Sequence, residues 1–104
     1  MASEGERLGP MRIEAVYRQI CDFARESGAR RVVLFGSRAR GTNLPKSDID
    51  IAIEGCEDFD ALRDRLQNDL WSLLELDVVN LDACTSDELR HEIERDGVTL
   101  YEEV

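Results

Sequence analysis

The sequence has few of the residues that build disulfides, metal clusters or membrane spans. Its three cysteines, Cys21, Cys56 and Cys84, form no CxxC pair, and His91 is its single histidine. An odd number of cysteines without that spacing argues against a disulfide framework and against a zinc site. We therefore expect ordinary thiols in a reducing compartment. No apolar run approaches the roughly 18 residues that span a bilayer, and no signal peptide is recognisable, so the sequence predicts a cytoplasmic protein without a membrane anchor.

Basic residues are also scarce. Thirteen Lys and Arg stand against 23 Asp and Glu, which gives a formal net charge of −10. This balance argues against non-specific binding to nucleic acid or to an anionic membrane surface. The charge is uneven, because residues 27–47 contain no acidic residue while residues 48–104 hold eighteen of them. The basic residues of this acid-free segment are Arg30, Arg31, Arg38, Arg40 and Lys46.

The length of 104 residues is sufficient for one domain. Residues 1–10 are polar and contain two Gly and one Pro, which predicts a disordered tail or a start at Met11. From the spacing of apolar residues we expect helices over residues 12–27, 57–74 and about 86–96, and strands over residues 31–35, 48–54, 76–81 and 98–101. This order predicts an α/β fold, a small mixed β-sheet with helices packed on it.

Several local signals set the expected boundaries. Gly28 is placed to end the first helix, and Gly97 is a candidate to end the last one. Thr85 and Glu88 have the spacing of a capping box. About a dozen residues connect the first two strands, which is long enough for a crossover containing a short helix.

Two aspartates open the second expected strand. Ile49, Ile51 and Ile53 alternate with Asp48 and Asp50, so the isoleucines share the core face and the carboxylates share the other. A third carboxylate, Asp77, interrupts the next apolar run. If that strand lies beside the second, three carboxylates converge, and all-oxygen ligands favour Mg²⁺ or Mn²⁺. Taken alone, the aspartate pair is better explained by a solvated strand surface or a helix cap.

The first strand ends in Gly36-Ser37, ahead of residues that are able to start a short helix. Such a turn presents backbone N–H groups and a hydroxyl to an anion, and glycine lets a phosphate approach the backbone. Arg38, Arg40 and Lys46 add positive charge nearby. In isolation the dipeptide is a plain turn, and each arginine is as compatible with a solvated surface as with phosphate binding.

The whole segment VLFGSRARGTNLPKSDIDIAI resembles the signature of the DNA polymerase β-type nucleotidyltransferase superfamily, and more narrowly that of its minimal nucleotidyltransferase (MNT) family. The shared pattern is an initial helix, GSRARG after the first strand, SDID at the second strand and an Asp in the third. The resemblance covers about residues 13–102. It implies a polymerase β-like fold, with residues 11–104 as a single minimal nucleotidyltransferase domain.

The resemblance also implies a reaction and a site. The reaction is metal-dependent transfer of AMP from ATP to a hydroxyl. Two Mg²⁺ ions, or Mn²⁺, would be held by Asp48, Asp50 and Asp77, with Asp77 as a candidate proton acceptor. The β- and γ-phosphates would be held by Gly36 and Ser37, and the candidates for further phosphate or partner contacts are Arg38 and Arg40.

The acceptor is implied by the family to be a protein. MNT proteins pair with helical HEPN proteins, often ribonuclease toxins, and members are implicated in transferring AMP to a tyrosine of that partner as antitoxins. Candidate contact surfaces are the helix faces near Trp71 and Leu74 and the loop 39–46, in a homo- or hetero-oligomer, although a place in the core explains Trp71 better than a partner contact does. The acidic second half either masks a basic RNA-binding surface of the toxin or keeps the protein soluble. Two alternatives stay open, an antitoxin that acts by binding alone and a transferase for a small molecule.

Overall fold

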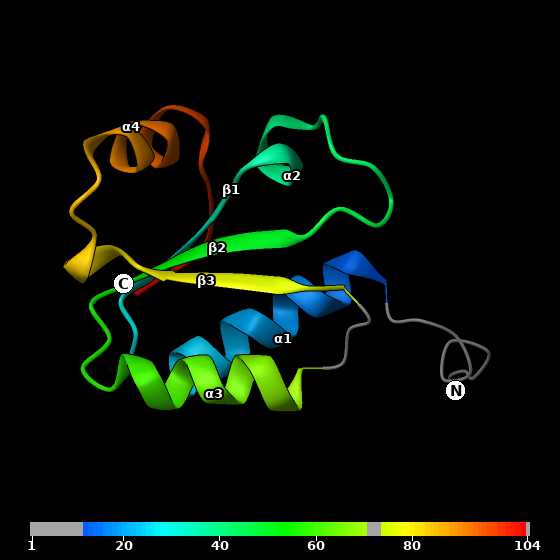
Figure 1. The fold of residues 1–104 in the computed structure, drawn as a ribbon. Coiled ribbons are helices and arrows are strands. Elements are labelled where there is room, and N and C mark those ends of the chain that lie inside the picture. The colour runs from blue at the N-terminus through cyan, green and yellow to red at the C-terminus, as the bar shows by residue number, and fades with distance from the viewer. Residues whose placement is uncertain (1–11, 71–73, 104) are drawn as a thin grey trace, which may run out of the picture.

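The computed structural model describes residues 12–70 and 74–103, which form a four-stranded sheet with helices on both faces (Figure 1). This architecture confirms the expected small mixed sheet. In chain order the elements are α1 (Ile13–Glu26), β1 (Arg31–Phe35), α2 (Ser37–Arg40), β2 (Ile49–Glu54), α3 (Phe59–Asp69), β3 (Leu76–Asn80), the 3₁₀ turn η2 (Leu81–Ala83), α4 (Asp87–Asp96) and β4 (Val98–Glu102).

The strands lie in the order β3-β2-β1-β4. β1 is antiparallel to both β2 and β4, whereas β2 and β3 are parallel. The expected short helix between the first two strands is α2, but the expected crossover is wrong. Because β1 and β2 are antiparallel, their connection folds back at one end of the sheet. The crossover instead joins the parallel strands β2 and β3 and contains α3.

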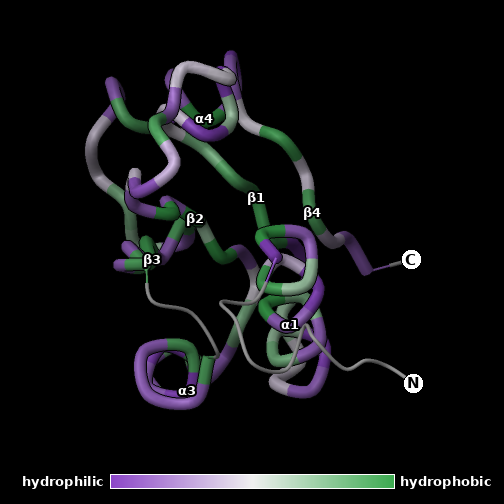
Figure 2. The backbone as a smooth tube through the Cα atoms, turned by 90° about the vertical axis from the view of Figure 1, so that its right-hand side faces the viewer, coloured by the Kyte–Doolittle hydropathy of each residue, from purple (hydrophilic) through white to green (hydrophobic). Residues whose placement is uncertain are grey.

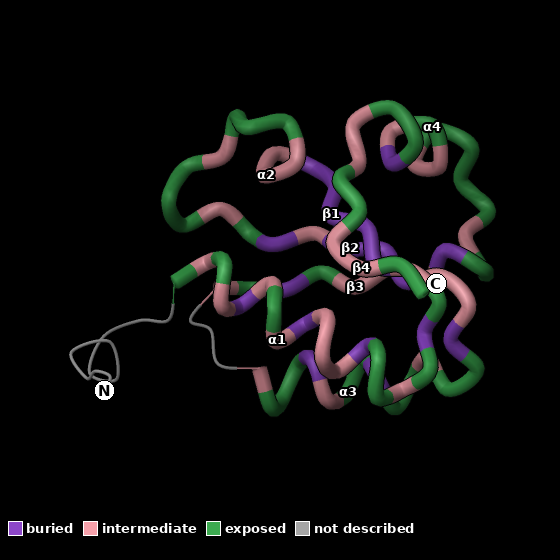
Figure 3. The backbone as a smooth tube through the Cα atoms, turned by 180° about the vertical axis from the view of Figure 1, so that it is seen from behind, coloured by how far each residue is buried: buried purple, intermediate pink, exposed green. Residues whose placement is uncertain are grey.

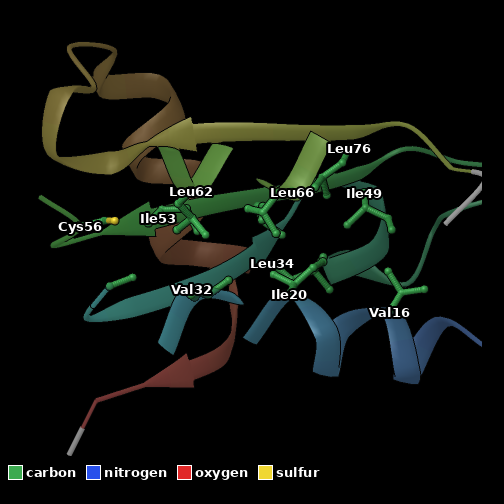
Figure 4. Packing of buried hydrophobic residues seen from close by; sticks show 13 residues of the cluster. Val16, Ile20, Val32, Leu34, Ile49, Ile53, Cys56, Leu62, Leu66 and Leu76 are labelled. Carbon is green, nitrogen blue, oxygen red and sulfur yellow. The ribbon is translucent and has the colours of Figure 1, made fainter. Parts of the chain in front are cut away.

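The larger part of the core lies between the sheet and the pair α1 and α3. Ile49, Ile51 and Ile53 of β2 are all fully buried there, as the alternation in the sequence predicts. Figure 4 shows Ile20 of α1 and Leu66 of α3 pointing toward these strands. α1 has an amphipathic pattern because its apolar residues recur every three or four positions, and it ends before Gly28, whose φ is +79°.

The opposite face of the sheet carries a smaller apolar cluster, Val33, Phe35, Ala52, Leu81 and Ile93. Helix α4 covers this cluster, so α4 lies on the other side of the sheet from α1 and α3 (Figure 2). Burial is concentrated in the two central strands, which both layers cover (Figure 3). The short helix α2 lies on the same side as α4, at the end of β1 (Figure 1).

Several expected boundaries move in the structure. The second long helix was expected over residues 57–74, but α3 begins at Phe59, because the Asp58 carboxylate caps it by accepting from Ala61 N at 3.2 Å. It ends at Asp69, where Leu70 adopts an extended backbone. Trp71, expected near a partner surface, lies outside the described residues.

The last helix is capped by Ser86, whose Oγ accepts from Leu89 N, and not by Thr85 as the capping-box spacing suggested. Gly97 does end α4, but with extended backbone. Its lack of a side chain matters because a Cβ there would collide with the Ile93 carbonyl oxygen and lie 2.6 Å from Val33 Cγ1. No helix within residues 12–70 and 74–103 has the length and apolar character needed to cross a bilayer.

Candidate nucleotide and metal site

Asp50 is placed at the centre of one end of the sheet. It pairs with Phe35 of β1 on one side and with Asp77 of β3 on the other. Ile49 and Ile51 point to the α1 and α3 layer, so Asp50 points to the α4 side. Asp77 stands opposite it in a parallel register with strands about 4.8 Å apart, and therefore shares that side. The strand pairing therefore brings Asp50 and Asp77 to neighbouring positions on β2 and β3, while Asp48 lies just before β2.

Gly36 follows Phe35 directly, which brings the Gly-Ser turn against Asp50. Its φ of +76° and ψ of −157° fall in a region that only glycine adopts readily. A Cβ on Gly36 would lie 3.2 Å from the Asp50 Cγ and closer still to Oδ2. The glycine is therefore required both for its backbone conformation and for clearance. A phosphate held on this turn would lie beside the Asp50 carboxylate.

The charges around Asp50 raise its pKa above the ordinary value for a carboxyl. Partial burial is the largest cause, followed by the negative charges of Asp77, Asp48 and Glu92, and Arg40 alone acts in the opposite direction. Carboxylates gathered in this way repel one another when ionised. A cation bound among them would relieve that repulsion, which is the property expected of a metal site.

The three aspartates do not form a closed metal cage. Within the described parts of the chain, no group of three or more His, Cys, Asp or Glu side chains is arranged to hold a metal ion. Asp48 and Asp77 are exposed, and Asp48 precedes β2. The donors are nevertheless hard carboxylate oxygens, and Mg²⁺ in nucleotide sites usually takes one or two carboxylates, with phosphates and water completing its shell. The residues fit a cation that arrives with a polyphosphate.

Ser37 begins the short helix α2, as the sequence suggested. The carbonyl oxygen of Gly36 accepts from the N–H groups of Ala39 and Arg40, both at 3.1 Å, which closes the single turn. The first N–H groups of a helix have no acceptor within it, and here they lie at the end of β1 beside Asp50. The structure therefore brings Gly36, Ser37 and Asp50 together.

The two arginines of the motif lie in different surroundings. Arg38 donates from Nε to Ser47 O at 3.1 Å and from Nη2 to Pro45 O at 3.0 Å, both in the loop before Asp48. Arg40 forms an ion pair from Nη1 to Glu92 Oε2 of α4 at 3.2 Å. The sequence reasoning missed Glu92. The partners are 52 positions apart, and no periodic signal links two positions so far apart.

The other basic residues of the acid-free segment divide by position. Lys46 is exposed in the loop between α2 and β2, at the same end of the sheet as Asp48. Arg31 begins β1, at the opposite end of that strand from Gly36, and its Nε lies 2.7 Å from Glu54 Oε1. Positive charge near the carboxylates therefore comes from Arg38, Arg40 and Lys46, and not from the whole segment.

Comparisons with known proteins agree with this geometry. The family model described as "Polymerase beta, Nucleotidyltransferase" matches residues 19–104. No curated protein matches the chain. Among solved structures, a toxin–antitoxin complex with AMP-PNP is 28% identical, with a TM-score of 0.67 over 84% of this chain and 73% of that one.

Two further structures are similar. One is a mutant of the toxin–antitoxin pair MntA–HpeT in which two aspartates, separated by one residue, are replaced by glutamate. It is 26% identical, with a TM-score of 0.67 over 84% of this chain and 73% of that one. The other is described as a minimal nucleotidyltransferase and is 25% identical, with a TM-score of 0.65 over 83% of this chain and 90% of that one.

Proposed function

The chain belongs to the polymerase beta nucleotidyltransferase family, and on this basis we propose that it transfers AMP from ATP to a hydroxyl group of a partner protein. The observation that carries the proposal is the placement of Asp50 opposite Asp77 and against Gly36. This arrangement puts a carboxylate pair beside a turn that suits phosphate. Both are needed to hold a nucleoside triphosphate with its cation.

Each polar group of the site has a part in the transfer. Gly36 and Ser37 bind the β- and γ-phosphates through backbone N–H groups and a hydroxyl. Asp48, Asp50 and Asp77 would hold two Mg²⁺ ions, which would supply charge stabilisation during the transfer. Arg40 exchanges its Glu92 partner for phosphate oxygens.

The transfer needs no reactant other than ATP and the acceptor hydroxyl. The acceptor oxygen forms a bond to the α-phosphorus, and the bond from that phosphorus to the bridging oxygen of the β-phosphate breaks. Pyrophosphate leaves. The proton of the acceptor hydroxyl passes to Asp77, which is exposed and therefore open to an incoming protein.

The acceptor is proposed to be a tyrosine of a helical HEPN-type toxin, with this chain as its antitoxin. The support comes from similar structures, one of a toxin–antitoxin complex with AMP-PNP and one of a toxin–antitoxin pair altered at two aspartates in a D-x-D arrangement. The Asp48-Ile49-Asp50 sequence has that arrangement here.

The test is transfer of label to the product of the neighbouring gene, incubated with this chain, Mg²⁺ and each α-labelled nucleoside triphosphate. We expect label on the partner from ATP, none with Asp50→Asn, and unchanged labelling with Asp64→Asn, which removes a charge from an exposed position of α3. A wild-type chain that neutralises its partner without labelling it under any nucleotide favours the alternative of an antitoxin that acts by binding alone.

A further inference from the structure

The loop between α2 and β2 is held together by its own hydrogen bonds. Leu44 N donates to Ser47 Oγ at 2.8 Å, and Ser47 N donates back to Leu44 O at 3.0 Å. This closes a turn over residues 44–47 immediately before Asp48. Residues 44–46 of the turn are exposed, and so are its hydrogen bonds from Leu44 N and to Pro45 O. Loops of this kind open readily unless another element holds them.

That other element is Arg38, on the helix next to the loop. Its Nε donates to Ser47 O and its Nη2 to Pro45 O, so the planar guanidinium engages two carbonyls of the turn at once. Ser47 is the residue before Asp48. A side chain anchored in α2 thus fixes the backbone immediately before Asp48.

We propose that Arg38 is a positioning residue, which clamps the turn at residues 45–47 and thereby holds Asp48 beside Asp50, and that it does not act as a phosphate ligand. The proposal rests on the proposed function in that it takes Asp48 to be a metal ligand. Its geometric basis is independent of that role, because both hydrogen bonds join Arg38 to main-chain oxygens and neither involves a site carboxylate.

The neighbouring arginine provides the contrast. Arg40 is bound to the Glu92 carboxylate, a partly exposed side chain that a phosphate can replace. Arg38 is bound to two backbone carbonyls, which do not move away without unfolding the turn. Arg38 and Arg40, which are separated by one residue, therefore have different roles. Arg38 holds the loop, and Arg40 binds the ligand.

Arginine and lysine separate the two roles. Lysine keeps the positive charge but has no planar fork, so it cannot make both carbonyl bonds. If Arg38 is a clamp, Arg38→Lys behaves like Arg38→Gln. If it is a phosphate ligand, Arg38→Lys keeps most of the wild-type behaviour. Arg18→Lys, on the exposed side of α1, is the matched control for the chemical change.

The first measurement is hydrogen exchange by mass spectrometry over residues 41–48, on the full chain without metal or nucleotide. We expect exchange about tenfold faster in both Arg38 variants, because neither can bridge the two carbonyls of the turn as arginine does, and no change in Arg18→Lys. Exchange at the wild-type rate in Arg38→Lys would overturn the proposal.

The second measurement is the Mg²⁺ concentration that gives half of the thermal stabilisation produced with saturating ATP. The clamp predicts an increase of about tenfold, equal in Arg38→Lys and Arg38→Gln, because Asp48 is no longer held in place. A wild-type midpoint in Arg38→Lys with a raised one in Arg38→Gln overturns it in favour of a charge role. If the wild-type chain itself is not stabilised by Mg²⁺ and ATP, the proposed function fails, and the exchange rates still decide whether Arg38 holds the loop.

Discussion

The two faces of strand β2 carry out opposite tasks within six residues. On one face Ile49, Ile51 and Ile53 are fully buried against α1 and α3. On the other, Asp50 lies beside Asp77 with its pKa raised by burial and like charges. The first face stabilises the fold and the second costs stability until a cation binds. Burial of the isoleucines therefore fixes the register of the strand, so the aspartates do not have to stabilise the fold and can bind a ligand.

The largest expected effect comes from a substitution on the apolar face of β2. Ile51→Ala removes a fully buried side chain from the centre of the core, and we expect the free energy of unfolding to fall by about 4 kcal/mol. Urea denaturation measures this loss. Val98→Ala, at a position 45% exposed on β4, is the matched control and should stay within about 0.5 kcal/mol of wild type. Equal losses in the two variants would contradict the claim that the isoleucine face of β2 stabilises the fold.

The next largest effect is expected at Gly36, which lies against Asp50 on the polar face of β2. Gly36→Ala places a Cβ against the Asp50 carboxyl in a backbone conformation that disfavours side chains, so we expect a loss of about 2 kcal/mol. Gly41→Ala has a similar φ of +78° but a ψ of 16°, in the left-handed region that costs a side chain less, and nothing lies within 4 Å of the new Cβ, so it reports a milder backbone strain without a clash. The same denaturation experiment should rank Gly36→Ala as the costlier. Equal losses of unfolding free energy in the two variants would show that the turn does not press on Asp50.

The third prediction concerns the polar face and the pH dependence of the protein's stability. Because the folded-state pKa of Asp50 is raised, wild type loses stability relative to the neutral variant Asp50→Asn as pH rises through that pKa. Asp50→Asn should therefore be the more stable protein at pH 7 without metal. The difference should vanish as pH falls below the ordinary carboxyl pKa of about 4. Thermal denaturation at a series of pH values checks this, and a less stable Asp50→Asn at pH 7 would contradict it.

The smallest expected effect concerns the Arg40–Glu92 pair. Its side chains are 41% and 32% exposed, and exposed ion pairs contribute little. Glu92→Gln should change the free energy of unfolding by less than about 0.5 kcal/mol, measured by urea denaturation. A loss well above that value would mean that the pair holds α4 to the sheet, and that Arg40 is not available to a ligand.

The part of the fold that follows from short-range patterns was predictable from the sequence. Alternation places Ile49 and Ile51 in the core, and the three- and four-residue spacing over residues 12–27 identifies α1. Strand direction was not predictable, because a connection of about a dozen residues suits either a crossover or a return at the same end. Helix capping is similar, since Thr85 and Ser86 have the same chemistry and only the local geometry chooses Ser86.

The candidate site divides in the same way. Asp50 and Asp77 were expected to meet because each belongs to an alternating or apolar strand, and the register brings them to neighbouring positions. The partners of the arginines could not be read from the chain. Glu92 comes from a helix far along the sequence, and Arg38 bonds to carbonyl oxygens, which every residue possesses. Such contacts depend on the three-dimensional path of the loop and leave no pattern in residue types.

The melting temperatures of wild type and Asp50→Asn, each alone, with Mg²⁺, with ATP and with both, test the nucleotide and metal site. If the polar face of β2 forms this site, wild type should gain stability from millimolar Mg²⁺ and ATP together. Asp50→Asn should gain none, although it melts no lower than wild type without ligands. An unchanged wild-type melting temperature, or an equal gain in Asp50→Asn, would contradict the account.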